Sequence, residues 1–123
     1  MPEILITPQG KPYFAMGDLH FSISHTQHYV FCALSPIPIG IDAEESSRKV
    51  DLRLAEKILS PGEKVQFDDA EDKQTALLTF WVLKEAQAKF TGTGLQGYPN
   101  HTDFHLDDPR VQTIGDCLVA IIT

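Results

Sequence analysis

Long apolar runs, cysteines and excess basic charge are all scarce in this sequence of 123 residues. Apolar runs such as Tyr29 to Leu34 are far too short to span a bilayer. The amino end, MPEILITPQG, has neither a basic start nor a long apolar stretch, so we expect no secretory signal and a cytoplasmic protein.

Cysteine occurs only twice, as Cys32 and Cys117. The two form no CxxC pair, which argues against a zinc site. Each lies in an apolar run that resembles a core strand, so we expect buried, reduced thiols. A disulfide between the two runs stays open as an alternative.

The charge balance is acidic, with 17 acids against 10 bases and a net charge of −7. This balance argues against a broad nucleic-acid-binding surface. Apolar residues make up 42% of the chain, which is ordinary for a globular protein with one core. We therefore expect one domain over residues 1–123.

Alternation of apolar and polar residues predicts several strands, and together with helical segments it indicates an α+β fold. We expect an antiparallel sheet packed against a long helix. The expected strands are 20–26, 28–34, 39–44, 101–106 and 117–123.

Helical spacing is present in three segments. The first is 51–59, and the second begins at Ser60, where Pro61 and Glu63 complete a capping box. The third, 72–90, contains no glycine or proline and is predicted as the longest helix, which Gly92 and Gly94 end.

Two carboxylates, Asp42 and Glu44, lie two residues apart in a predicted strand. Because strand side chains alternate, both project from the same face. Neighbouring anions repel unless a cation lies between them, and Mg²⁺ prefers such oxygen ligands. A pair of exposed acids at a strand end is the simpler interpretation.

On the predicted long helix, Trp81, Glu85 and Lys89 are spaced four residues apart and so share one side. A surface Glu–Lys pair is the simpler interpretation. However, Leu78 and Ala88 make this the core-facing side, where a charged side chain is costly unless it has a partner. A metal ion and a polyanionic ligand would provide one.

His25 ends the first predicted strand, and a single histidine there is more often structural than functional. A hydrolase triad of Ser24, His25 and Asp42 is disfavoured because adjacent strand residues point to opposite faces and no nucleophile elbow is present. A metal site at His25 and His28 is disfavoured because strand positions three apart do not share a face.

Four motifs in order resemble the 4′-phosphopantetheinyl transferases. They are GKP at 10–12, FSISHT at 21–26, IGIDAE at 39–44 and FWVLKEAQAKFTGTGL at 80–95. The ISHT strand resembles the larger, surfactin-synthetase-activating type, whereas the short chain and the GTG turn resemble the small holo-acyl-carrier-protein synthases. Ala43 departs from the family's GIDIE pattern, and we expect only a local change of packing there.

The resemblance implies transfer of phosphopantetheine from coenzyme A to a serine of an acyl or peptidyl carrier protein, with release of 3′,5′-ADP. Asp42, Glu44 and Glu85 match the family's Mg²⁺ site. Glu85 would also take the serine proton, directly or through a metal-bound water. Lys89 matches the lysine that contacts the transferred phosphate, where it would stabilise developing charge.

The resemblance also implies a nucleotide site. His25 and Lys11 match residues that hold the adenosine 3′-phosphate or the nucleotide, and Ser24 lies at a nucleotide-contacting position. Fatty acid, polyketide and nonribosomal peptide carriers all stay open as partners.

The chain resembles only the second half of the surfactin-type enzymes, in which coenzyme A lies between two such domains. We therefore expect a homo-oligomer, either a dimer or a trimer, with sites at the boundary between chains. Arg48, Lys49 and Arg53 are candidates for the cations that a second chain would supply. The alternatives are a separately encoded partner half, a non-catalytic module that binds coenzyme A or a carrier, and a metal-dependent phosphohydrolase.

Overall fold

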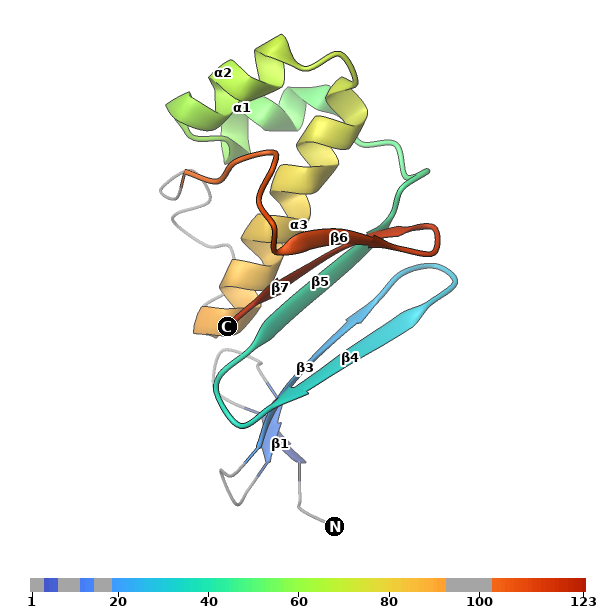
Figure 1. Cartoon of the computed structure of the whole chain (residues 1–123), viewed down its shortest axis with the longest axis vertical. Helices are drawn as coiled ribbons and strands as arrows, with labels where there is room; N and C mark the ends of the chain where they lie inside the picture. The colour runs from blue at the N-terminus through green and yellow to red at the C-terminus, as the bar shows by residue number, and fades with distance from the viewer. Residues whose placement is uncertain (1–3, 7–11, 15–18, 93–102) are drawn as a thin grey trace.

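The computed structural model describes residues 4–6, 12–14, 19–92 and 103–123. Its strands form three antiparallel units (Figure 1). Two are hairpin-like pairs, β1 (Ile4–Ile6) with β2 (Pro12–Phe14) and β3 (His20–His25) with β4 (Val30–Ser35). In the third, β7 (Cys117–Ile122) lies between β5 (Gly40–Glu45) and β6 (Val111–Ile114).

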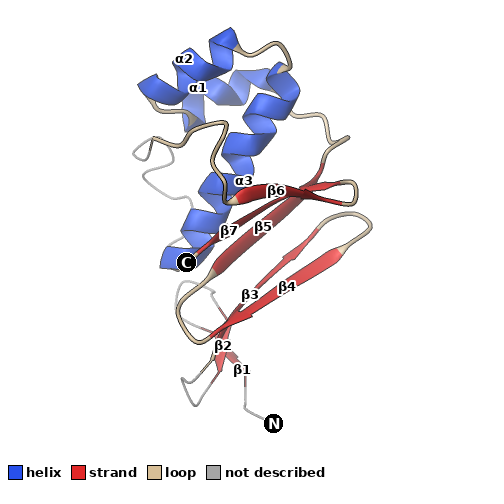
Figure 2. Cartoon of the chain, viewed as in Figure 1, coloured by secondary structure: helices blue, strands red, loops and turns tan. Residues whose placement is uncertain are grey.

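Four helical segments follow β5: η1 (Leu52–Leu54), α1 (Ala55–Ile58), α2 (Pro61–Asp69) and α3 (Lys73–Thr91). Figure 2 shows α1 and α2 gathered at one end of α3, which runs along the sheet of β5, β7 and β6. The predicted α+β fold, with antiparallel strands packed against a long helix, is confirmed. No helix among the described residues is long and apolar enough to cross a membrane.

Strand β5 approaches α3 very closely at Gly40. A Cβ atom built on Gly40 would lie 2.1 Å from the carbonyl oxygen of Ala86 and 2.5 Å from the backbone nitrogen of Phe90. Only glycine fits such an approach between backbones. Residues of β5 that follow Gly40 at steps of two therefore also face α3.

The start of α2 and the end of α3 lie where the sequence predicts them. Ser60 and Glu63 form both bonds of the capping box at the start of α2, with Pro61 in the first turn. Asp72 caps α3 by accepting a hydrogen bond from the backbone N–H of Thr75 at 3.0 Å. Gly92 ends α3 in the left-handed conformation with φ of 77°, whereas Gly94 lies outside the described residues.

The strand predicted at 101–106 is wrong for its described part, because 103–106 forms no strand. Side chains of α2 satisfy its backbone instead. Phe104 donates its N–H to Glu63 Oε2 at 2.7 Å, and Leu106 donates its N–H to Gln66 Oε1 at 3.0 Å.

The last hairpin is formed by β6 and β7. The helix predicted over 51–59 is reduced to η1 and the single turn α1.

One face of the β3–β4 hairpin is exposed. Ile23 on β3 and Val30 and Leu34 on β4 expose 45%, 75% and 63% of their surface. Cys32 lies on the same side of β4 and is exposed, so its predicted burial is wrong, whereas Cys117 is buried as expected. Both thiols are free, so the alternative of a disulfide between them is not realised.

Candidate active site

Strand β5 and helix α3 together present three carboxylates and a lysine. Asp42 and Glu44 follow Gly40 at steps of two, on the side of β5 that faces α3. Glu85 and Lys89 lie one turn apart on α3 and are half-buried, at the border of the core rather than within it. The four charged side chains that the sequence predicts to act together therefore lie at one strand–helix boundary.

Asp42 is almost completely buried, with 6% of its surface exposed. Its Oδ1 accepts hydrogen bonds from Lys89 Nζ at 3.1 Å and from Ser24 Oγ at 3.3 Å. Its Oδ2 is buried and has no hydrogen-bond partner among the described residues. A buried carboxylate oxygen without a donor is costly, and a cation is the group that would best relieve the cost.

The surroundings of Asp42 favour its neutral form. Its pKa is raised from 3.8 to about 7, because burial and the nearby Glu85 and Glu44 raise it more than Lys89 lowers it. Burial also raises the pKa of Glu85, with Glu44 adding to that shift while Lys89 and Arg48 oppose it. The three acids therefore lie close enough to repel one another.

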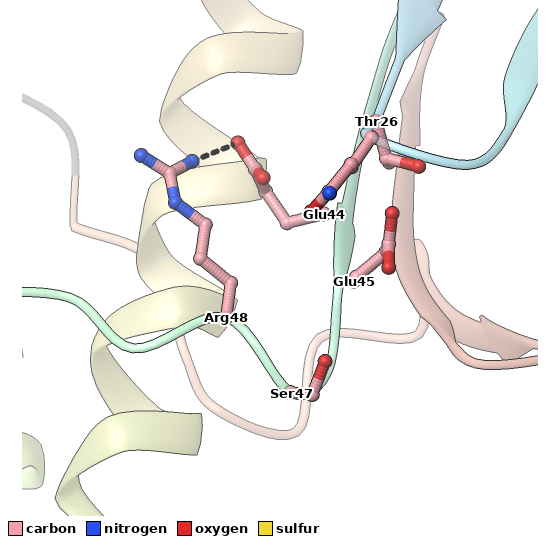
Figure 3. Close-up of a pocket in the computed structure, with 6 residues that line it drawn as sticks. Thr26, Glu44, Glu45, Ser47 and Arg48 are labelled. Carbon is pink, nitrogen blue, oxygen red and sulfur yellow. Dashed lines mark hydrogen bonds and ion pairs between the residues drawn. The ribbon is translucent and has the colours of Figure 1, made fainter.

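Glu44 forms an ion pair with Arg48, whose Nη1 lies 2.6 Å from Glu44 Oε1. Figure 3 shows this pair at the wall of a polar pocket of about 240 Å³, which Thr26 and Ser47 also line. Within the described ranges, no three His, Cys, Asp or Glu side chains are already grouped as metal ligands. Basic side chains hold two of the three predicted ligands, Asp42 through Lys89 and Glu44 through Arg48.

Lys89 joins three elements. Its ammonium donates to Asp42 on β5 and to the carbonyl oxygen of Ile23 on β3, at 3.2 Å. The side chain keeps 31% of its surface exposed, so it is accessible from solvent at this boundary. A lysine in this position can neutralise an anion that approaches the acids.

The nucleotide residues of the sequence prediction lie at the end of β3. Ser24 is buried beside Asp42, whereas His25 is exposed on the opposite face of the strand, across from Val30. This alternation separates His25 from the Ser24–Asp42 contact and excludes a hydrolase triad. His28 pairs with Glu45 at 2.8 Å, and Lys11 lies outside the described residues.

Two features of the site region escaped the sequence analysis. Ser22 and Ser24 accept the backbone N–H groups of Ile41 and Ala43, so serine hydroxyls join β3 to β5. A buried ion pair of Lys84 and Glu63, at 2.8 Å, joins α3 to α2. The sequence signal for the first feature was the pair of serines on one face of β3. The signal for the second was Lys84, a charged residue within the apolar stretch of α3.

Carboxylates beside a lysine at one strand–helix boundary are side chains that suit a divalent cation and an anionic ligand. The family model of the 4′-phosphopantetheinyl transferase superfamily matches residues 38–115, and the chain belongs to this family. The matched segment contains Asp42, Glu44, Glu85 and Lys89, whereas Ser24 and His25 lie before it.

Relatives with the same description include gsp of Aneurinibacillus migulanus, with 35% identity over 85% of this chain and 44% of that protein. Sfp of Bacillus subtilis strain 168 is 37% identical over 70% of this chain and 39% of its own length. The chain thus spans about two-fifths of these relatives. The structure is similar to holo-[acyl-carrier-protein] synthase of Thermotoga maritima, with a TM-score of 0.57 and 25% identity over 69% of this chain and 61% of that chain.

Proposed function

We propose that this chain transfers 4′-phosphopantetheine from coenzyme A to a serine of a carrier protein in a Mg²⁺-dependent reaction. The observation that carries the proposal is the buried, unpartnered Oδ2 of Asp42 beside two further carboxylates and Lys89. Family membership and the names of the relatives support the reaction class.

The residues present fit a divalent cation. Asp42, Glu44 and Glu85 would hold it, because carboxylate oxygens are the ligands that Mg²⁺ prefers. A cation would satisfy Asp42 Oδ2, and it would offset the burial and the mutual repulsion that raise the pKa of Asp42 and of Glu85. When bound, Mg²⁺ would neutralise pyrophosphate charge and polarise the phosphorus centre.

Lys89 and Glu85 would carry the remaining chemistry. Lys89 would contact the transferred phosphate and balance the charge that develops there. The carrier's serine oxygen forms the new bond to phosphorus, the bond to the leaving phosphate breaks, and 3′,5′-ADP departs. Glu85 would accept the serine proton, directly or through a metal-bound water.

The nucleotide part of coenzyme A would lie against the end of β3. His25 is exposed there, one residue from the Ser24–Asp42 contact, and would bind the 3′-phosphate together with Lys11. The resemblance implies a nucleotide contact for Ser24 as well. Charge-assisted bonds to that phosphate would favour coenzyme A over its 3′-dephospho form.

We further propose that the active form is a homo-oligomer, a dimer or a trimer. The exposed apolar face formed by Ile23, Val30 and Leu34 supports this proposal, because such patches commonly mark contact surfaces. Of the candidate cations for a neighbouring site, Arg48 and Arg53 already pair with Glu44 and Asp51 of their own chain.

The test is to incubate the chain with coenzyme A, Mg²⁺ and several apo carrier proteins, and to measure each carrier by intact-protein mass spectrometry. The proposal predicts a mass gain of one phosphopantetheine on at least one carrier, abolished by EDTA. Binding of coenzyme A without a mass gain would favour the non-catalytic module. Phosphopantetheine or phosphate release without any carrier would favour the phosphohydrolase.

A further inference from the structure

Strands β3 and β5 are neighbours that belong to separate sheets. Two serine hydroxyls of β3 form the bridge. Ser22 Oγ accepts the N–H of Ile41 and Ser24 Oγ accepts the N–H of Ala43, each at 3.0 Å. Both serines are 4% exposed, so the two bridges are closely matched.

The two serines differ in where the hydroxyl proton goes. A serine that accepts one N–H still has a proton to donate. Ser24 donates it to Asp42 Oδ1 at 3.3 Å, and Lys89 donates to the same oxygen. Both described donors therefore lie on Oδ1, while Oδ2 has none.

We propose that Ser24 is a positioning residue for Asp42, which it holds so that Oδ2 stays available to the divalent cation. This inference rests on the proposed metal site. Residues that hydrogen-bond to metal ligands fix their orientation, and their loss typically weakens metal binding by about 10- to 100-fold.

The proposal predicts that loss of the Ser24 hydroxyl weakens metal binding and that loss of the Ser22 hydroxyl does not. A role in strand packing alone would predict the same effect for both. Ser24→Ala and Ser22→Ala each remove one hydroxyl bond to a backbone N–H of β5. Both should therefore lower the unfolding midpoint, and Ser24→Ala also removes a donor from Asp42 Oδ1. Only Ser24→Ala should remove a hydrogen bond that fixes the orientation of the Asp42 carboxylate.

The experiment titrates the full chain with Mn²⁺ and follows free Mn²⁺ by electron paramagnetic resonance. Ser24→Ala should weaken Mn²⁺ binding about tenfold or more, Ser22→Ala should stay within about twofold of the unchanged protein, and Ser24→Thr should restore binding. In the transfer assay, Ser24→Ala should raise the Mg²⁺ concentration for half-maximal rate by a similar factor.

Equal Mn²⁺ affinity in Ser24→Ala and the unchanged protein would overturn the proposal, and so would equal losses in Ser22→Ala and Ser24→Ala. An Asp42→Asn variant separates this failure from failure of the metal site itself. If Asp42→Asn also binds Mn²⁺ normally, the metal assignment is wrong and the role of Ser24 falls with it. If only Asp42→Asn loses binding, the metal site stands without Ser24.

Discussion

Asp42 occupies a position where a protein without a ligand would place an apolar residue. It lies on a buried strand between Ile41 and Ala43, both almost fully buried. Its charge is compensated on one oxygen only. The cost of ionising it therefore appears directly as a dependence of stability on pH.

We predict that Asp42→Asn stabilises the metal-free protein at neutral pH. Burial, Glu85 and Glu44 raise the pKa of Asp42 from 3.8 to about 7 against the pull of Lys89, so the folded state holds this proton more tightly than the unfolded state. Stability should fall as pH rises from about 4 to about 7, and the loss should be complete above pH 7. The amide avoids this loss, which is on the order of 4 kcal/mol.

Urea unfolding in EDTA at a series of pH values measures this effect. The difference between Asp42→Asn and the unchanged protein should grow from near pH 4 to pH 7. Asp107→Asn, at an exposed acid, is the control and should show no such growth. A constant difference across this range would mean that Asp42 is not destabilised when charged.

At the level of elements, the close contact of β5 with α3 places the acids of one beside those of the other. We predict that Gly40→Ala displaces α3, because the new methyl would lie 2.1 Å from the Ala86 carbonyl oxygen. The free energy of unfolding should drop by at least about 2 kcal/mol. Transfer activity should fall as well.

Gly62→Ala is the matched control for this change. Its Cβ would lie 3.4 Å from Asp103 Oδ1, an ordinary contact, so stability should stay unchanged or rise by up to about 1 kcal/mol. Chemical denaturation of both variants makes the comparison. Equal stability of the Gly40 and Gly62 variants would contradict the close approach.

The junction of α2 and α3 depends on the buried pair of Lys84 and Glu63. Removing one member leaves the other charged and buried, so Lys84→Met should cost about 3–5 kcal/mol. Lys64→Met breaks a more exposed pair with Glu56 and should cost at most about 1 kcal/mol. Guanidinium unfolding of the two variants tests this, and similar losses in both would show that the buried pair does not stabilise the junction.

Elements with local signals could be predicted from the sequence. The capping box at Ser60 and Glu63 and the glycine stop at Gly92 both formed as expected. The segment 103–106 could not be predicted, because Glu63 and Gln66 of a distant helix satisfy its backbone. The exposure of Cys32 depends on what covers the β3–β4 hairpin, and no local pattern reports that.

Some placements of candidate site residues could be predicted from local geometry. Alternation along a strand puts Asp42 and Glu44 on one face, and helical spacing puts Glu85 and Lys89 on one side. The bridging serines could not be predicted in this way. Their role depends on how β3 lies beside β5, which is a tertiary property. The pairing of Arg48 with Glu44 likewise follows from the turn after β5.

For the whole molecule, we predict that the exposed apolar face of β3 and β4 is buried between chains. Val30→Glu should shift the protein toward the monomer and reduce transfer activity, because a charge is costly in an apolar interface. Val65→Glu, at a valine of α2 that is 64% exposed, should leave assembly unchanged. Light scattering coupled to gel filtration provides the measurement. A fully active monomer of the unchanged chain would contradict the shared-site proposal.

The most direct test of the central claim compares phosphopantetheine transfer by the unchanged chain and by Asp42→Asn, at saturating coenzyme A and apo carrier and over a range of Mg²⁺. The size-matched amide should fold, yet it should lower the transfer rate by at least about 100-fold at every Mg²⁺ concentration, because a metal ligand is lost. Asp107→Asn should keep the normal rate. Near-normal transfer by Asp42→Asn would show that the carboxylates between β5 and α3 are not the reaction centre.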